Sequence, residues 1–234
     1  MSDDSSRPVL EFDDVWLPLR EQEGGSVAID LALRAGDLVL VQPGDEQHER
    51  ALVDAACGLA SPSKGAVRFL SRAWPDLPAE QANALRGRIG HVFRRGAWIS
   101  YLTLLDNVLL PQLYHTRRSY AELRAEAARL AAWFGLPGLP SGRPDDIAPA
   151  DLQRAAYVRA FLGSPALIIL EGAAGHLIGG LLPPLINAIR AARDRDAAVL
   201  WFAQNPDVFH DSTIPVTRRL RLRRHAIEPM EAVS

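Results

Sequence analysis

Residues 36–59 have the layout of a nucleotide-binding loop, but the side chains that would do its chemistry are replaced. Residues 38–41 form a short apolar run that predicts a buried strand, and residues 49–57 predict a helix after a short loop. A phosphate-binding loop in this place reads G-x-x-x-x-G-K-[ST], because backbone N–H groups and a lysine hold the phosphates. Here the two glycine positions hold Pro43 and His48, and the lysine position holds Glu49. Arg50 takes the Ser/Thr position.

The backbone and the charge of this loop both oppose phosphate binding. Pro43 has no N–H to donate, and Gly44 is the residue there that readily adopts left-handed backbone. Three negative side chains follow, namely Asp45, Glu46 and Glu49. One contact between unit charges near 4 Å is worth about 4 kcal/mol at an effective dielectric of about 20. Reversing its sign costs about twice that, comparable with the roughly 8 kcal/mol of a micromolar complex.

We therefore expect no nucleotide or other cofactor here, and interpret the loop as an ordinary strand-to-helix connection. Its residues are Pro43, Gly44, Asp45, Glu46, Gln47, His48, Glu49, Arg50 and Ala51. His48 is expected to be a solvated loop histidine. Residual nucleotide binding is the alternative, with Arg50 offsetting part of the negative charge.

The composition predicts one substantial hydrophobic core and excludes several classes of partner. The chain has 234 residues, is 48% hydrophobic and carries a net charge of −2 with both signs spread along it, so we expect no nucleic acid partner. Its one cysteine, Cys57, excludes an internal disulfide, and the histidines lack metal-ligand spacing. The polar start and the absence of an apolar run of about 20 residues predict a soluble cytoplasmic chain. Such a chain could still dock on a membrane protein.

Strand and helix patterns alternate along the chain, which predicts an α/β fold with a largely parallel sheet. Strands are expected at residues 9–17, 26–33, 38–41, 65–70, 88–93, 166–170 and 197–203. Helices are expected at residues 49–57, 78–86, 119–134, 151–162 and 181–193, the third opened by a capping box from Ser119 to Glu122. Residues 104–162 are largely helical, and residues 217–227 predict a basic closing strand or hairpin. We interpret the basic run 218–224 as a solvated strand face rather than as a site for acidic lipid or nucleic acid.

The order of these elements resembles the ATP-binding cassette of ABC transporters over nearly the whole chain. Residues 36–59, 89–94, 102–111 and 153–170 follow that family in register. The resemblance implies a P-loop NTPase-like ABC cassette with a RecA-like mixed/parallel sheet core and an N-terminal antiparallel β part. The chain would be a single domain, residues 1–234. Residues 1–95 and 163–234 would form its core, with a helical subdomain inserted at about 96–162.

The resemblance also implies which catalytic positions are altered. The family's magnesium-binding aspartate and its catalytic glutamate correspond to Glu171 and Gly172, and its switch histidine corresponds to Gln204. Ile178 takes the place of the D-loop aspartate. The LSGGQ signature corresponds to Ile147, Ala148, Pro149, Ala150 and Asp151. We expect no catalytic residue and no metal here, although Glu171 could be either a structural carboxylate or a metal ligand.

A partner surface is expected just after the predicted strand at residues 88–93, since the family's Q-loop faces the membrane subunit. Arg94 stands at the Q-loop glutamine position. The expected interface comprises Arg94, Arg95, Trp98, Ile99, Tyr101 and Leu104. The alternatives are that the arginines are a solvated pair and that some of the apolar residues belong to the core.

The leading hypothesis is a degenerate, catalytically silent ABC subunit of a bacterial transporter, peripheral on the inner (cytoplasmic) membrane, with a structural or regulatory role. Its partners would be an integral membrane permease and either a second cassette or another copy of itself. Residues 98–111 most resemble cassettes of the Mce-linked lipid transporters, which implies lipid transport. Two alternatives stay open. One is an ATPase with an atypical site that uses Arg50, Glu171 and Gln204, and the other is a soluble adaptor with a cassette fold and no transport role.

Overall fold

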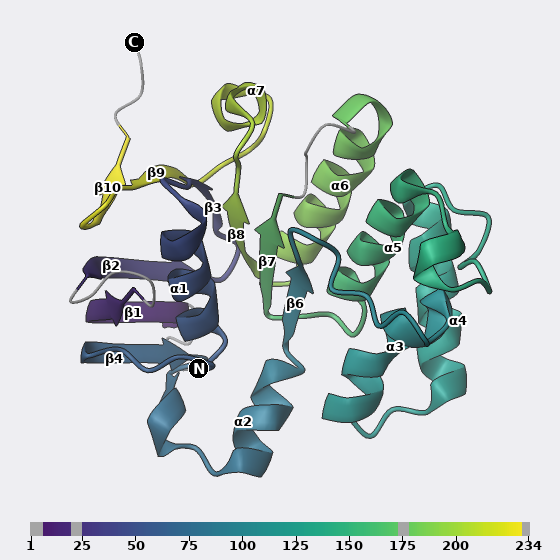
Figure 1. The fold of residues 1–234 in the computed structure, drawn as a ribbon, viewed down its shortest axis with the longest axis horizontal. Coiled ribbons are helices and arrows are strands. Elements are labelled where there is room, and N and C mark those ends of the chain that lie inside the picture. The colour runs from purple at the N-terminus through teal and green to yellow at the C-terminus, as the bar shows by residue number, and fades with distance from the viewer. Residues whose placement is uncertain (1–6, 20–24, 173–177, 231–234) are drawn as a thin grey trace.

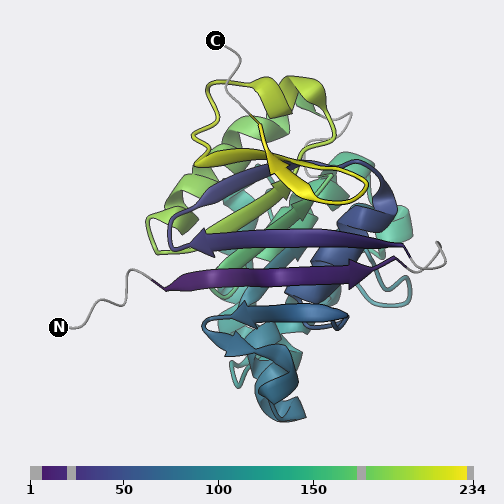
Figure 2. The same ribbon diagram turned by 90° about the vertical axis from the view of Figure 1, so that its left-hand side faces the viewer.

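The chain forms two sheets with one helix packed between them. The structure is a computed structural model that describes residues 7–19, 25–172 and 178–230 (Figure 1). An antiparallel sheet contains β1 (Pro8–Pro18), β2 (Ser26–Arg34), β4 (Lys64–Phe69) and β5 (Arg72–Ala73), in the order β2-β1-β4-β5. Figure 2 shows this sheet facing the viewer, in front of the second sheet. The mixed α/β class predicted from the sequence is confirmed.

The second sheet is almost entirely parallel and places the functional positions at one edge. It contains β3 (Leu38–Gln42), β6 (Ile89–Val92), β7 (Leu167–Glu171), β8 (Ala198–Phe202), β9 (Arg218–Leu222) and β10 (Ile227–Pro229). Their order is β10-β9-β3-β8-β7-β6, and β10 alone runs antiparallel, to β9. Because the strands from β9 to β6 are parallel, the segments that follow β3, β6, β7 and β8 all start at the same edge.

Helices cover both faces of the parallel sheet and divide the buried apolar side chains into two clusters. Helix α1 (Glu46–Ala56) buries Leu52 and Val53 between the two sheets. The other face is covered by α5 (Pro149–Phe161) and α6 (Ile178–Arg193). Helices α3 (Leu104–His115) and α4 (Tyr120–Trp133) pack against α5 farther from the sheet, as Figure 1 shows. Within residues 7–19, 25–172 and 178–230, the remaining helices are α2 (Ala79–Arg86), α7 (Pro206–His210) and two 3-10 turns, at Trp74–Asp76 and Pro144–Asp146. No helix in the described parts of the chain has both the length and the apolar character needed to cross a bilayer.

Three helices begin earlier than the sequence predicts. Helix α1 begins at Glu46 rather than at residue 49, because Asp45 caps it. Helix α5 begins at Pro149, a residue suited to a first turn because that turn does not use its N–H. Helix α6 begins at Ile178 and continues through two prolines inside its length. The capping box at Ser119 and Glu122 is confirmed.

Helix α5 lies directly against β6, and one glycine makes this approach possible. A Cβ atom added to Gly90 would lie 1.8 Å from the backbone oxygen of Ala160. Strand β6, which leads into the post-β6 loop, is therefore packed closely against α5, the helix that starts in the signature segment.

Candidate functional site

The loop between β3 and α1 is closed by its own carboxylate. Asp45 is the N-cap of α1, and its Oδ1 accepts the backbone N–H of His48 at 2.9 Å and the His48 ring Nδ1 at 2.5 Å. Partial burial acts to raise the pKa of Asp45, but these hydrogen bonds lower it below its usual range. Helix N-termini favour anions because their N–H groups are unpaired. Here a side chain of the same loop already provides the negative charge.

His48 is buried, so the expectation of a solvated histidine is wrong. The residue is only 1% exposed, and its Nε2 lies 2.9 Å from the backbone oxygen of Arg224. Its two ring nitrogens thus face the carboxylate of Asp45 and the backbone carbonyl of Arg224. The turn between β9 and β10 covers His48, and this turn lies 176 residues further along the chain.

Gly44 is required by a close approach and not by left-handed backbone. A Cβ atom at this position would lie 2.6 Å from the backbone oxygen of Leu222, at the end of β9. Gly44 is not among the described glycines that have a positive φ. The loop backbone is therefore packed closely against the end of β9.

Glu49, at the position of the phosphate-binding lysine, forms a buried ion pair with Arg94. Its Oε2 accepts a hydrogen bond from Arg94 Nη2, and the residue is only 1% exposed. Its other oxygen, Oε1, is buried without a hydrogen-bond partner. Burial raises the pKa of Glu49 to about 7; the charge of Arg94 acts against this rise and that of Glu171 adds to it. Arg94 is thus neither half of a solvated pair nor a free partner contact.

Glu171 and His91 form a second pair beside the first. Glu171 ends β7, and its Oε1 pairs with Nε2 of His91 in β6. The contact favours the structural interpretation of Glu171 over a metal ligand. Gly172 follows with a φ of 60°, and a Cβ there would lie 3.6 Å from Cγ of Arg94. No cluster of three or more metal-ligating side chains occurs within the described ranges.

The other predicted site positions do not join this group. Gln204 is exposed after β8, and Arg50 points to Asp54, with Nε 3.8 Å from its Oδ2. In the signature segment, Ala148 caps α5 without a side-chain bond, and Asp151 pairs with Arg154 at 2.7 Å. The segment around Ile147 and Ala150 therefore presents no side-chain donor, and Pro149 has no N–H.

The predicted partner surface is only partly available. Leu104 is fully buried in the core, so its assignment to the interface is wrong, because α3 begins there and packs inward. Trp98 is partly buried under the guanidinium of Arg159, 4.3 Å from the ring centroid. Ile99 is half-buried and pairs through its backbone with Asn107. Tyr101 and Arg95 are exposed.

An apolar groove beside this surface was not predicted. It measures about 460 Å³ and lies between the ends of α1 and α2, strand β6, and helices α3 and α5. Exposed apolar side chains line it, among them Leu59, Phe93, Leu110 and Tyr114. No local sequence pattern marks this groove, because its lining comes from five separate elements and Leu110, Leu113 and Tyr114 are all exposed on the same helix.

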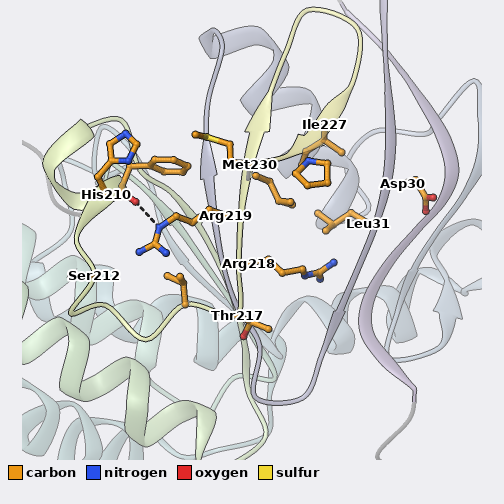
Figure 3. A pocket seen from close by; sticks show the side chains of 13 residues that line it. Asp30, Leu31, His210, Ser212, Thr217, Arg218, Arg219, Ile227 and Met230 are labelled. Atoms are coloured by element: carbon orange, nitrogen blue, oxygen red, sulfur yellow. Dashed lines mark hydrogen bonds between the residues drawn. The ribbon is translucent and has the colours of Figure 1, made fainter. Parts of the chain in front are cut away.

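A second cavity, of about 720 Å³, lies away from the altered loop, between β2, β9, β10 and α7 (Figure 3). Its arginines are engaged in internal hydrogen bonds. Arg219 donates to the backbone oxygens of Phe209 and Asp211, both at 2.8 Å, and Arg218 donates to that of Ala32. Leu220 and Leu222, which alternate with them, are buried. The basic run thus anchors the closing strand as well as forming its polar face.

Comparisons with known proteins agree with this architecture. No protein-family model matches the chain. It is 30% identical over 172 residues to the macrolide export ATP-binding/permease protein MacB of Chromobacterium violaceum, which covers 72% of this chain and 27% of that protein. It is 27% identical over 164 residues to the lipoprotein-releasing system ATP-binding protein LolD of Idiomarina loihiensis, covering 68% and 72% of the two chains. The structure of MJ0796, a bacterial ABC transporter cassette, superposes with a TM-score of 0.81 at 19% identity, covering 95% of this chain and 99% of that one.

The fold is that of an ABC transporter cassette. By sequence the chain is a homologue of ABC transporter ATP-binding proteins. The chain spans about a quarter of the length of its MacB relative.

The residues present do not fit a magnesium triphosphate. The carboxylate of Asp45 already accepts a hydrogen bond from the His48 N–H at the start of α1, and a second carboxylate, that of Glu49, replaces the lysine. The guanidinium of Arg94, which reaches the lysine position, is engaged with Glu49. A triphosphate would have to displace both contacts and leave Glu49 buried beside it.

The raised pKa of Glu49 predicts a pH-dependent stability. In the unfolded chain, Glu49 loses its proton at the ordinary glutamate pKa of 4.5. In the folded chain, Glu49 keeps this proton up to about pH 7. The free energy of unfolding should therefore decrease as pH rises from 5 to 7, by up to about 1.4 kcal/mol per pH unit. Urea denaturation of Glu49→Gln should lack this component, whereas the exposed Glu46→Gln should retain it. Identical pH profiles for wild type and Glu49→Gln would contradict the assignment.

Proposed function

We propose that the chain is a non-catalytic cassette subunit of a membrane transporter, which acts through protein contacts rather than through ATP hydrolysis. The observation that carries this proposal is the buried Glu49–Arg94 pair at the position of the phosphate-binding lysine. Buried charges are retained when they are paired, and breaking such a pair costs about 3–5 kcal/mol. A nucleotide would have to displace Arg94 from this pair, or drive Glu49 to take up a proton, before gaining any binding of its own.

The arrangement also disfavours the atypical ATPase. Arg50 points away from the loop toward Asp54, and Glu171 is held by His91. Gly172 offers no general base at the position where the family's glutamate would stand. An active site would need these side chains to leave their present partners.

For the partner, we propose an amphipathic helix of an integral membrane permease. Its apolar face would lie in the groove at Leu110 and Tyr114. The MacB relative is named an ATP-binding/permease protein, so there the homologous cassette and a permease share one chain. The groove adjoins the post-β6 loop and exposes apolar side chains from several elements. Exposed apolar patches of this kind mark interaction sites. Membrane association would follow from this contact, and a second cassette or a second copy of the chain would complete the assembly.

A lipid-like solute is the substrate class that we propose for the assembled transporter. It is supported by the resemblance of residues 98–111 to Mce-linked cassettes, and by the name of the LolD relative, which places that protein in a lipoprotein-releasing system. A soluble adaptor without a transport role would show neither a permease partner nor a lipid phenotype on deletion.

Titration of the purified chain with Mg-ATP by calorimetry tests the silent site. We expect no saturable heat up to millimolar nucleotide, which corresponds to a binding free energy weaker than about −4 kcal/mol. Circular dichroism on the same sample verifies that the chain is folded. Saturable binding together with ATP turnover that is lost in Glu171→Ala would instead establish the atypical ATPase.

The groove is tested with two substitutions on one helix. Leu110 and Leu113 are equally exposed, at 38% and 37%, but of the two only Leu110 lines the groove. Affinity purification from native membranes should lose a co-purifying permease with Leu110→Asp and keep it with Leu113→Asp. A permease that is retained by both variants, or lost by both, would refute this docking site.

A further inference from the structure

The loop that follows β6 is held from two sides by charged side chains. From α1, Glu49 binds Arg94. From α5, Arg159 donates to the backbone oxygens of Gly96 and Ala97, at 2.5 and 3.2 Å, and its guanidinium lies over the Phe93 and Trp98 rings. Gly96 and Ala97 have φ values of 75° and 47°, and the second is uncommon for a residue with a side chain. The contacts hold the loop in a conformation that its sequence alone does not favour.

The two tethers differ in their response to protons. Arg159 keeps its charge throughout the physiological range, although burial lowers its pKa to about 10. Glu49 is a buried carboxylate with an unpartnered Oε1, and a second carboxylate, Glu171, acts on it from the end of β7. An unpartnered oxygen near a like charge is the place where a proton would bind.

The remaining charged groups around Glu49 have their own partners. On α1, Glu46 lies 3.9 Å from Arg95, and Asp45 binds His48. On β6, His91 is paired with Glu171. Arg94 is therefore the cation that holds the charge of Glu49, and its side chain is 22% exposed and can reach solvent.

We propose that Glu49 is a proton-operated latch that positions the post-β6 loop. Ionised Glu49 holds Arg94 and with it the first part of the loop. When Oε1 takes up a proton from solvent, the charge attraction is lost, Arg94 turns outward, and the loop is tethered through Arg159 alone. Phe93 lines the groove, so the docking surface would then respond to local acidity at the position where related cassettes carry their nucleotide lysine. This consequence for docking rests on the proposed function, whereas the latch itself does not. A carboxyl pKa of about 7 places the change within the physiological range.

Hydrogen exchange of the intact chain, followed by mass spectrometry at pH 6 and pH 8, tests the latch. The reporter is the amide of Gly96, which donates to the backbone oxygen of Phe93 at 3.1 Å. After correction for the intrinsic pH dependence of exchange, protection should be about tenfold lower at pH 6, corresponding to about one pKa unit of lost interaction. Global stability should change in the opposite sense, which separates local release from general loosening.

Glu49→Gln should show the lower protection at both pH values, whereas Glu46→Gln should behave as the wild type. Equal protection at pH 6 and 8 in the wild type would overturn the latch, as would a pH response that persists in Glu49→Gln. The measurement needs neither nucleotide nor permease. Its failure therefore leaves the proposed function standing, and ATP binding in the calorimeter would leave the latch standing.

Discussion

A buried carboxylate must be paired or protonated, and this constraint at Glu49 shapes the edge of the parallel sheet. The side chain lies where the family's nucleotide lysine would be, and Arg94 reaches it from the end of β6. The pair connects α1 to a loop 45 residues further along the chain. Beside it, Asp45 caps the start of α1, and Glu171 pairs with His91. The negative and positive charges that a nucleotide and its metal cation would place at this edge are thus provided by the protein's own side chains.

The scaffold around these pairs does not depend on their chemistry. Strands β3, β7 and β8 are apolar and buried on both faces, and α1 is packed between two sheets. Burial of this kind contributes about 25 cal/mol per Å² of apolar surface, whichever groups occupy the strand ends. A cassette fold can therefore persist while its phosphate-handling residues are replaced.

The elements whose signal is local could be predicted from the sequence. Short apolar runs predicted strands β3 and β7, and the capping box of Ser119 and Glu122 predicted the start of α4. The site could be predicted only in part, because its contacts join distant segments. The burial of His48 comes from the turn at Arg224, and no local pattern reveals that partner. Similarly, Glu49 and Arg94 were each visible as altered positions, but their mutual contact was not. The start of α1 was placed too late because Asp45 was interpreted as a loop charge rather than as a cap.

A double-mutant cycle between Glu49 and Arg94 tests the central claim most directly, with unfolding free energies measured at pH 8. Arg94→Ala should destabilise the chain, because the buried carboxylate then either lacks its cation or must take up a proton at a pH above its pKa. In the Glu49→Gln background the same substitution should cost much less, giving a coupling energy of about 1–3 kcal/mol. If Arg94→Ala costs the same in both backgrounds, the two side chains do not form the pair on which this account depends.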